Sequence, residues 1–475
     1  MRNSIYTYHS PVVATVISLC ALTLTTSSKP VFADNTQQYN LSSTASLEST
    51  QSTVITTVHQ PLLLDKDIQL TEETLGKRNI DNSHKNIISY KDETSSYTKL
   101  QTARDKYLHL SNSQHWHAIS SGPSLTFGDT HQQVKELKSQ LSLLGDLRFP
   151  TKKTSPTRNQ RHEVFEKHQE DSIFFDRNLE QALIRFQKRN GLEVTGKLDP
   201  ITRKTINTPP AVVANKISHN LNRWQQLPEQ FGERYVLVNL PNYQLQFVAD
   251  GEIKLSMKVI IGRKLRPTPM MVDKITSIVF NPSWNVPPKI AKLDLLPAIK
   301  RDPNFLHHKK FNVYSDWKAT EPLDSTTINW EAIDPEEFTY RLRQSPGDQN
   351  ALGRIKFYLA NDRAIYLHDT NHKELFLKNK RSLSSGCIRI ENPLELANQI
   401  LQLEPNTMDE TPEEQLSTAE TKAIPLHAPI PIYLMYWTAW IDENNQLQIR
   451  DDIYGNDKLD SAKLKNPLPP MNGRI

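Results

Sequence analysis

The sequence predicts an α+β protein of several domains, with helices in its N-terminal half and mainly strands in its C-terminal half. The chain has 475 residues, which is more than one ordinary hydrophobic core accommodates. Up to about Leu227 the apolar residues recur at helical spacing. From Tyr235 onward short apolar runs alternate with Pro-Asn, Asp-Gly and Gly-Arg turns, a pattern typical of strands.

The composition excludes some classes of protein. Apolar residues make up 37% of the chain, with 30 prolines and 14 glycines, as in a globular protein with polar, loop-rich segments. The net charge is +4, and removal of residues 1–33, which hold Arg2 and Lys29 and no acid, leaves +2 (4 − 2). Because this excess is weak and no basic stripe is interleaved with aromatic residues, nothing favours a nucleic-acid partner.

The N-terminus has the pattern of a signal peptide. An apolar run from Val12 to Leu24 follows a short region with Arg2 and precedes Val31-Phe32-Ala33. The run is shorter than the ~20 residues that cross a bilayer, so we expect cleavage after Ala33 and export, with an uncleaved anchor as the alternative. Leu19 before Cys20 is not the small residue that a lipoprotein site needs.

Export would leave a single thiol, because Cys20 lies in the predicted signal peptide and Cys387 is the other cysteine. Exported proteins usually pair their cysteines in disulfides. Cys387 is therefore either a buried, inert residue or a reactive nucleophile.

The helical half divides into four segments after the signal peptide. Residues 34–96 predict a low-complexity, disordered linker, rich in Ser, Thr and Gln up to about residue 60 and ambiguous beyond it. Residues 97–127 predict a helical scaffold segment, and residues 209–232 a linking helix. Residues 128–208 predict three helices, around 134–144, 179–186 and 199–206, with Gly145 ending the first and a charged surface loop at 151–171.

Residues 233–455 predict the β-rich domain, interrupted by an inserted loop or cap at 288–355 and followed by a tail at 456–475. The runs that predict strands are 235–240, 244–248, 253–261, 278–280, 355–359, 364–367, 430–441 and 446–453.

Two segments of this domain contain the residues for a cysteine acyl-transfer site. They are Ile365-Tyr366-Leu367-His368-Asp369 and Ser384-Ser385-Gly386-Cys387-Ile388-Arg389-Ile390. Such a site needs a base that raises the thiolate fraction and N–H donors for the developing oxyanion. His368 ends an apolar strand, and Gly386 allows a tight turn that brings N–H groups close, with Ser384 and Ser385 as hydroxyl donors.

Arg389 lies two residues after the thiol. If Cys387 starts a strand, Arg389 shares its face and can hold a substrate carboxylate. Each residue alone also has an interpretation without function: His368 as a surface histidine, Gly386-Cys387 as a common dipeptide and Arg389 as a solvated side chain. Zinc is not expected, because no Cys-x-x-Cys or His-Glu-x-x-His spacing accompanies the thiol.

The motif as a whole resembles a known family. His368, fifteen residues, then Ser-x-Gly-Cys-Ile-Arg is similar to the signature of L,D-transpeptidases with a YkuD-type catalytic domain, in particular their long, YcbB-like branch from Gram-negative bacteria. Many shorter members have His where this chain has Ser385, whereas the long branch tends to have Ser. Residues 128–208 resemble the three-helix peptidoglycan-binding domain, on positions such as Gly128, Phe186-Gln187 and Gly196.

The resemblance implies a function in cell-wall biogenesis and cell shape, in the periplasm of a Gram-negative bacterium. Cys387 would attack the third residue of a tetrapeptide stem and expel D-Ala, with His368 as base. A diaminopimelate amine of another stem would then release the acyl group as a 3→3 cross-link. Gly386 and Cys387 would donate backbone N–H groups, and Arg389, Tyr366 and Asn392 would hold the substrate. The resemblance implies no cofactor and no metal, acylation by carbapenems, and association with other wall-synthesis enzymes as an open option.

Three alternatives stay open at the level of sequence. Water as the acceptor would make the chain an L,D-carboxypeptidase or an amidase. A chain without catalytic activity would be a wall-binding scaffold. Whether the three-helix unit binds glycan or only supports the catalytic domain is also open. A general cysteine peptidase is the third alternative, although no helical start like that of papain precedes Cys387.

Overall fold

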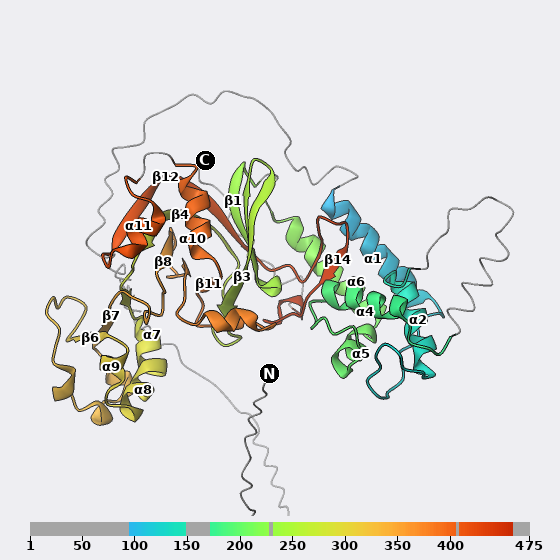
Figure 1. The fold of residues 1–475 in the computed structure, drawn as a ribbon, viewed down its shortest axis with the longest axis horizontal. Helices are drawn as coiled ribbons and strands as arrows, with labels where there is room; N and C mark the ends of the chain where they lie inside the picture. The colour runs from blue at the N-terminus through green and yellow to red at the C-terminus, as the bar shows by residue number, and fades with distance from the viewer. Residues whose placement is uncertain (1–94, 149–171, 228–230, 405–407, 459–475) are drawn as a thin grey trace, which may run out of the picture. The chain divides into compact units, whose positions relative to one another are not determined.

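The computed structural model describes residues 95–148, 172–227, 231–404 and 408–458 (Figure 1). The predicted signal peptide, nearly all of the linker, the loop at 151–171 and most of the tail lie outside these residues. In the described part of the chain, no helix combines the length and apolarity needed to cross a membrane.

Helices form the N-terminal half, as predicted. In chain order they are α1 (Ser96–Asn112), α2 (Gln133–Leu144), α4 (Arg177–Arg189), α5 (Pro200–Ile206) and α6 (Pro210–Trp224). Local signals set their ends. The side chains of Ser95, Asp176 and Asp199 cap the first turns of α1, α4 and α5, and Gly145 ends α2 in the left-handed conformation at φ 86°.

Helices α2, α4 and α5 share a small core that includes Leu137, Leu141, Leu183 and Phe186. The Gln187 side chain lies inside this unit and donates to Thr195 Oγ1, the Lys197 carbonyl and Thr202 Oγ1, each at 3.0 Å. These bonds fix the loop between α4 and α5, because a buried amide left unpaired would cost about 1–3 kcal/mol.

The C-terminal half is built on a nine-stranded sheet with the order β10-β3-β11-β9-β8-β4-β12-β1-β2. Strands β2 and β3 also pair, so the sheet closes on itself like a barrel with β10 attached at β3. The strands are β1 (Arg234–Asn239), β2 (Gln244–Ala249), β3 (Glu252–Gly262), β4 (Met271–Phe280), β8 (Ile355–Leu359), β9 (Leu367–His368), β10 (Ser382–Ser384), β11 (Ile388–Ile390) and β12 (Lys422–Met435). Helices α10 (Pro393–Leu401) and α11 (Pro412–Ser417) follow β11.

One predicted strand is wrong in its extent. The run 364–367 was expected to be extended, but β9 contains only Leu367 and His368. Ala364 adopts the left-handed conformation at φ 53°, which ends regular pairing. Asn361 shapes the turn before it, because its side-chain oxygen accepts from the backbone N–H groups of Arg363 and Ile365.

The insertion is more than a loop, because it has its own secondary structure and core (Figure 1, yellow). It contains α7 (Pro288–Ile290), a π-helical turn η4 (Ala291–Leu295), α8 (Leu296–Arg301) and α9 (Phe305–His308). A three-stranded sheet joins β5 (Trp284–Asn285), β7 (Arg341–Gln344) and β6 (Phe311–Tyr314) in that order. Because β5 precedes Pro288, this folded unit begins earlier than the predicted cap.

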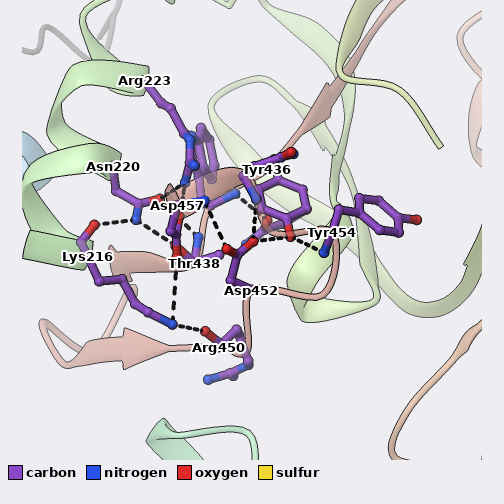
Figure 2. Close-up of polar contacts among 12 residues, drawn as sticks. Lys216, Asn220, Arg223, Tyr436, Thr438, Arg450, Asp452, Tyr454 and Asp457 are labelled. Atoms are coloured by element: carbon purple, nitrogen blue, oxygen red, sulfur yellow. Dashed lines mark hydrogen bonds and ion pairs between the residues drawn. The ribbon is translucent and has the colours of Figure 1, made fainter. Parts of the chain in front are cut away.

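The segment after β12 packs against α1 and α6 through the hairpin β13 (Ala439–Ile441) and β14 (Leu447–Ile449). Figure 2 shows the polar network at this junction. Arg223 of α6 forms an ion pair with Asp457 at 2.8 Å, and Asn220 exchanges two hydrogen bonds with Thr438. Asp452 accepts from Tyr436 Oη and from two backbone N–H groups, so the last described turn is tied to the barrel.

Candidate active site

Six side chains meet on one face of three adjacent strands. β9 lies between β8 and β11 in the sheet, with Lys356 opposite His368 and His368 opposite Arg389. Opposed residues, and residues two apart on a strand, project from the same face. The face therefore carries two rows of three residues: Lys356, His368 and Arg389, and next to them Tyr358, Tyr366 and Cys387.

The other face of the same strands belongs to the barrel core. Phe357, Leu367, Ile388 and Ile390 alternate with the site residues and are fully buried. The alternation explains why the site is rigid: a one-residue slip of any strand would expose its core residues and bury its polar ones.

Cys387 lies directly before β11 in a tight turn. Gly386 has φ +129°, a conformation that L-residues rarely adopt. The thiol is partly buried, and Sγ donates to the Ala364 carbonyl at 3.5 Å. Burial raises the pKa of the Cys387 thiol above its usual value, and a backbone hydrogen bond from Tyr366 and the charges of Lys356 and Arg389 oppose that rise. The thiol is therefore protonated at neutral pH and needs a base.

His368 is buried, with its Nδ1 2.5 Å from the Asp369 carbonyl. A carbonyl only accepts, so Nδ1 carries the proton and Nε2 keeps its lone pair for use as a base. Burial and then the charge of Arg389 lower the pKa of His368 to about 3, although the bond to Asp369 works against this. The imidazole is thus neutral in the folded protein.

Arg389 lies on the same face and has hydrogen-bond donors that its described neighbours do not fully use. Its Nη1 donates weakly to Thr370 Oγ1 at 3.5 Å, and its buried Nε has no hydrogen-bond partner among the described residues. A buried guanidinium N–H without a partner is costly, so the geometry favours an anionic or carbonyl ligand at this position.

Two of the predicted donors are already engaged. The Gly386 N–H donates to Ser384 Oγ at 3.1 Å, and Ser384 Oγ donates to the Cys387 carbonyl at 2.6 Å. Ser385 Oγ accepts from Arg266 at 3.0 Å. The Gly386 N–H and the Ser384 hydroxyl thus stabilise the turn itself, whereas Ser385 only accepts here. The oxyanion role of these residues stays a prediction.

Asn392 does not join the other predicted site residues. It follows the far end of β11 and starts α10, whereas Cys387 precedes the strand. Five residue steps of extended chain, about 16 Å, separate the two positions. The substrate contact of Asn392 stays a prediction that this placement does not favour.

The turn that carries Cys387 is held from outside by residues that the sequence did not indicate. Thr268 Oγ1 donates to the Gly386 carbonyl at 2.7 Å and accepts from the Gly262 N–H at 2.9 Å. Tyr454 Oη donates to the Gly262 carbonyl at 2.6 Å. Arg266, which also contacts Ser385, forms an ion pair with Asp294 of the insertion. These residues lie far from the motif in sequence, so no local signal indicated them.

Lys356 is the other residue that was missed. It sits in a predicted strand that looked like ordinary barrel core, and only the pairing of β8 with β9 brings it beside His368. In the described part of the chain, no group of three or more His, Cys, Asp or Glu side chains is arranged to hold a metal ion.

Comparison with known protein families gives two matches. Residues 233–416 match the L,D-transpeptidase catalytic domain of the YkuD type, and residues 130–206 match the "Putative peptidoglycan binding domain". Both matches agree with the resemblance seen in the sequence, and the helical unit followed by a mainly β barrel is the α+β architecture that was predicted.

A "Putative L,D-transpeptidase" of Haemophilus influenzae is 37% identical over 246 residues, which are 52% of this chain and 49% of the relative. The chain thus spans about half the length of this curated relative. Among solved structures, an L,D-transpeptidase from Mycobacterium smegmatis is 12% identical over 43% of this chain and 58% of its own, with a TM-score of 0.21. L,D-transpeptidase 3 from Mycobacterium tuberculosis, in complex with a faropenem-derived adduct, is 9% identical over 43% and 60%, with a TM-score of 0.21. Nothing about this chain follows from scores this low.

Proposed function

We propose that this chain forms 3→3 cross-links in peptidoglycan, because residues 233–416 match the L,D-transpeptidase catalytic domain and residues 130–206 match a peptidoglycan-binding domain. The observation that carries the proposal is the placement of Cys387, His368 and Arg389 on one face of adjacent strands within the catalytic domain. A nucleophile, a neutral base and an anion-binding group are the minimum set for acyl transfer from a peptide.

The first half of the reaction uses the donor stem. As Cys387 Sγ attacks the carbonyl carbon of diaminopimelate, the S–H bond breaks and the proton passes to Nε2 of His368. Collapse of the tetrahedral intermediate breaks the C–N bond to D-Ala, whose amine takes that proton as it leaves. Arg389 is suited to hold a stem carboxylate, and Tyr366 lines the same row as the sulfur. The product is a thioester on Cys387.

The second half releases that thioester. The side-chain amine of a second stem attacks the thioester carbonyl, His368 accepts a proton from the amine, and the C–S bond breaks. The sulfur leaves as a thiolate and regains the proton from His368. Burial of His368 keeps bulk water away from the base, which favours an amine that is held in place over a passing water.

The outcome of the reaction is tested by product analysis. Purified protein incubated with disaccharide-tetrapeptides is expected to yield D-Ala and dimers that resist D,D-endopeptidase. Tripeptides without dimers would assign the chain to the hydrolases, and no change in the muropeptides despite binding to sacculi would leave only the scaffold function.

The nucleophile is tested separately. We expect intact mass spectrometry after carbapenem treatment to show one covalent adduct, absent in Cys387→Ala and formed about 10²–10⁴-fold more slowly in His368→Ala, the usual value of general-base assistance. A folded protein without an adduct would contradict the nucleophile assignment. The 130–206 domain is proposed to hold the enzyme on the wall in the periplasm, which deletion of that domain followed by fractionation would test.

A further inference from the structure

A buried lysine shares the face of the proposed nucleophile. Lys356 on β8 is 8% exposed and stands opposite His368 in the register of β8 and β9. Lysine is rarely this buried, because removing an ammonium from water is costly unless other groups compensate. The position therefore has a structural or a chemical reason.

Two aromatic rings hold the ammonium in place. Lys356 Nζ lies 3.9 Å from the ring centroid of Tyr358 and 3.8 Å from that of Tyr366, and the two rings contact each other edge to face at 5.2 Å. Both distances are well inside the ~6 Å range of cation–π attraction, which is strongest where water is excluded. The charge is thus fixed over Tyr366, and Tyr366 is the neighbour of Cys387 in its row.

Lys356 and Arg389 stand on either side of His368 in the other row, so the imidazole lies between two cations. Both charges lower the pKa of His368, and both lower that of Cys387. A stable imidazolium–thiolate pair, in which His368 would supply the positive charge, does not suit this arrangement. The positive charge at the sulfur comes instead from groups that never release a proton during the reaction.

We propose that Lys356 is a positioning residue of the active site, whose fixed ammonium stabilises the negative charge on the Cys387 sulfur and keeps His368 neutral. This inference rests on the proposed role of Cys387 as nucleophile. The proton balance is simple: the thiol proton goes to Nε2 of His368, and Lys356 takes no part in the proton transfer. Lys356 acts through the local field and through its contact with the Tyr366 ring.

Two carboxylates near the site are engaged with other described residues. Asp369 accepts from the Arg354 N–H and is paired with Lys373, which neutralises it locally. Glu374 hydrogen-bonds to His372 at the surface. Among the described residues, the titratable and charged groups around Cys387 are Lys356, Tyr358, Tyr366, His368, Asp369, Glu374, Arg389 and, through Ser385, the Arg266–Asp294 pair.

The test measures the thiol itself. The full chain is alkylated with iodoacetamide from pH 5 to pH 10.5, and the rate at Cys387 is read by peptide mass spectrometry, which separates it from Cys20. Lys356→Met removes the charge and keeps the length of the side chain. We expect its rate profile to move to higher pH by at least one unit, so that alkylation at pH 7.5 slows about tenfold or more. Lys356→Arg keeps the charge and should restore most of the wild-type rate.

Lys274→Met is the matched control, because Lys274 is an exposed lysine on β4, the next strand in the sheet. Its profile should equal that of the wild type. Lys356→Gln is measured in parallel as a second neutral variant. The alkylation profile is interpreted only for a neutral variant with a native circular dichroism spectrum. A folded neutral variant with an unchanged profile overturns the proposal, and so does failure of both neutral variants to fold while Lys356→Arg folds, because the charge would then serve folding.

Iodoacetamide needs no stem peptide, so this experiment separates the two proposals. A shifted profile in a protein that makes no cross-links supports the field of Lys356 and contradicts the proposed transpeptidation. An unchanged profile in a protein that makes cross-links contradicts only the role of Lys356.

Discussion

At the scale of single residues, burial decides the chemistry of the site more than the identity of its residues does. A histidine near a cysteine suggests an ion pair, yet both groups are neutral here, because burial raises the pKa of Cys387 and lowers that of His368 to about 3. In the proposed reaction the thiolate is therefore formed during attack and is not present in the resting protein. This is a property of the environment, which the motif alone does not contain.

The depressed pKa of His368 predicts a contribution to acid sensitivity. Below about pH 6.5 the unfolded chain protonates this histidine, whereas the folded protein does not until about pH 3. Stability from this group is thus fully present above pH 6.5 and is lost as the pH falls towards 3, with a slope of up to about 1.4 kcal/mol per pH unit. His368→Asn should flatten the fall, as measured by urea unfolding at pH 7, 6, 5 and 4.

His115, which is exposed, gives the control variant His115→Asn, whose pH dependence should match the wild type. If His368→Asn loses stability between pH 6.5 and 4 as steeply as the wild type does, His368 is not the group responsible.

At the scale of elements, local sequence signals predicted the helices, whereas the site depends on the pairing of strands that are far apart in sequence. Ser95, Gly145, Asp176 and Asp199 define helix ends within a few residues of sequence, so α1, α2, α4 and α5 were predicted closely. β9 contains only two residues, too few for a periodic pattern. Lys356 became visible only through the register of β8 with β9.

The turn that carries Cys387 depends on the loop between β3 and β4. Thr268 is 2% exposed and its hydroxyl joins the Gly386 carbonyl to the Gly262 N–H. Thr268→Val keeps the shape but leaves both backbone groups without this partner, at a cost of about 1–3 kcal/mol. We expect a folded protein with a lower free energy of unfolding and a carbapenem acylation rate reduced about 10-fold or more, because the turn loses its fixed geometry.

The matched control is Thr320→Val, at an exposed position in the insertion. It should change neither quantity. An acylation rate in Thr268→Val equal to the wild type, in a folded sample, would mean that the turn holds its shape without Thr268.

At the scale of the whole molecule, the segment that follows β12 connects the helical half to the active-site turn. From α6, contacts run through Arg223 and Asp457 to Thr438, and from Asp452 through Tyr436 to Tyr454 (Figure 2). Tyr454 Oη then donates to the Gly262 carbonyl, in the loop that holds Gly386. Sequence comparison matches the catalytic domain only to residue 416, so this segment lies beyond the matched region. The architecture and the resemblance to L,D-transpeptidases were predicted from sequence, whereas the Arg223–Asp457 pair joins residues more than 200 positions apart.

The Arg223–Asp457 pair is the link whose removal should be most costly. Both side chains are about nine-tenths buried, and Asp457 Oδ1 also accepts from Thr438. Breaking a buried pair leaves one charge without its partner and typically costs about 3–5 kcal/mol, whereas an exposed pair contributes about 0–1 kcal/mol. Asp457→Asn should therefore lower the free energy of unfolding by several kcal/mol in urea denaturation. Asp451→Asn breaks the exposed ion pair between Asp451 and Lys380, and it should change the free energy of unfolding by less than about 1 kcal/mol. Equal effects of the two substitutions would show that the junction between α6 and the C-terminal segment contributes little to the stability of the folded chain.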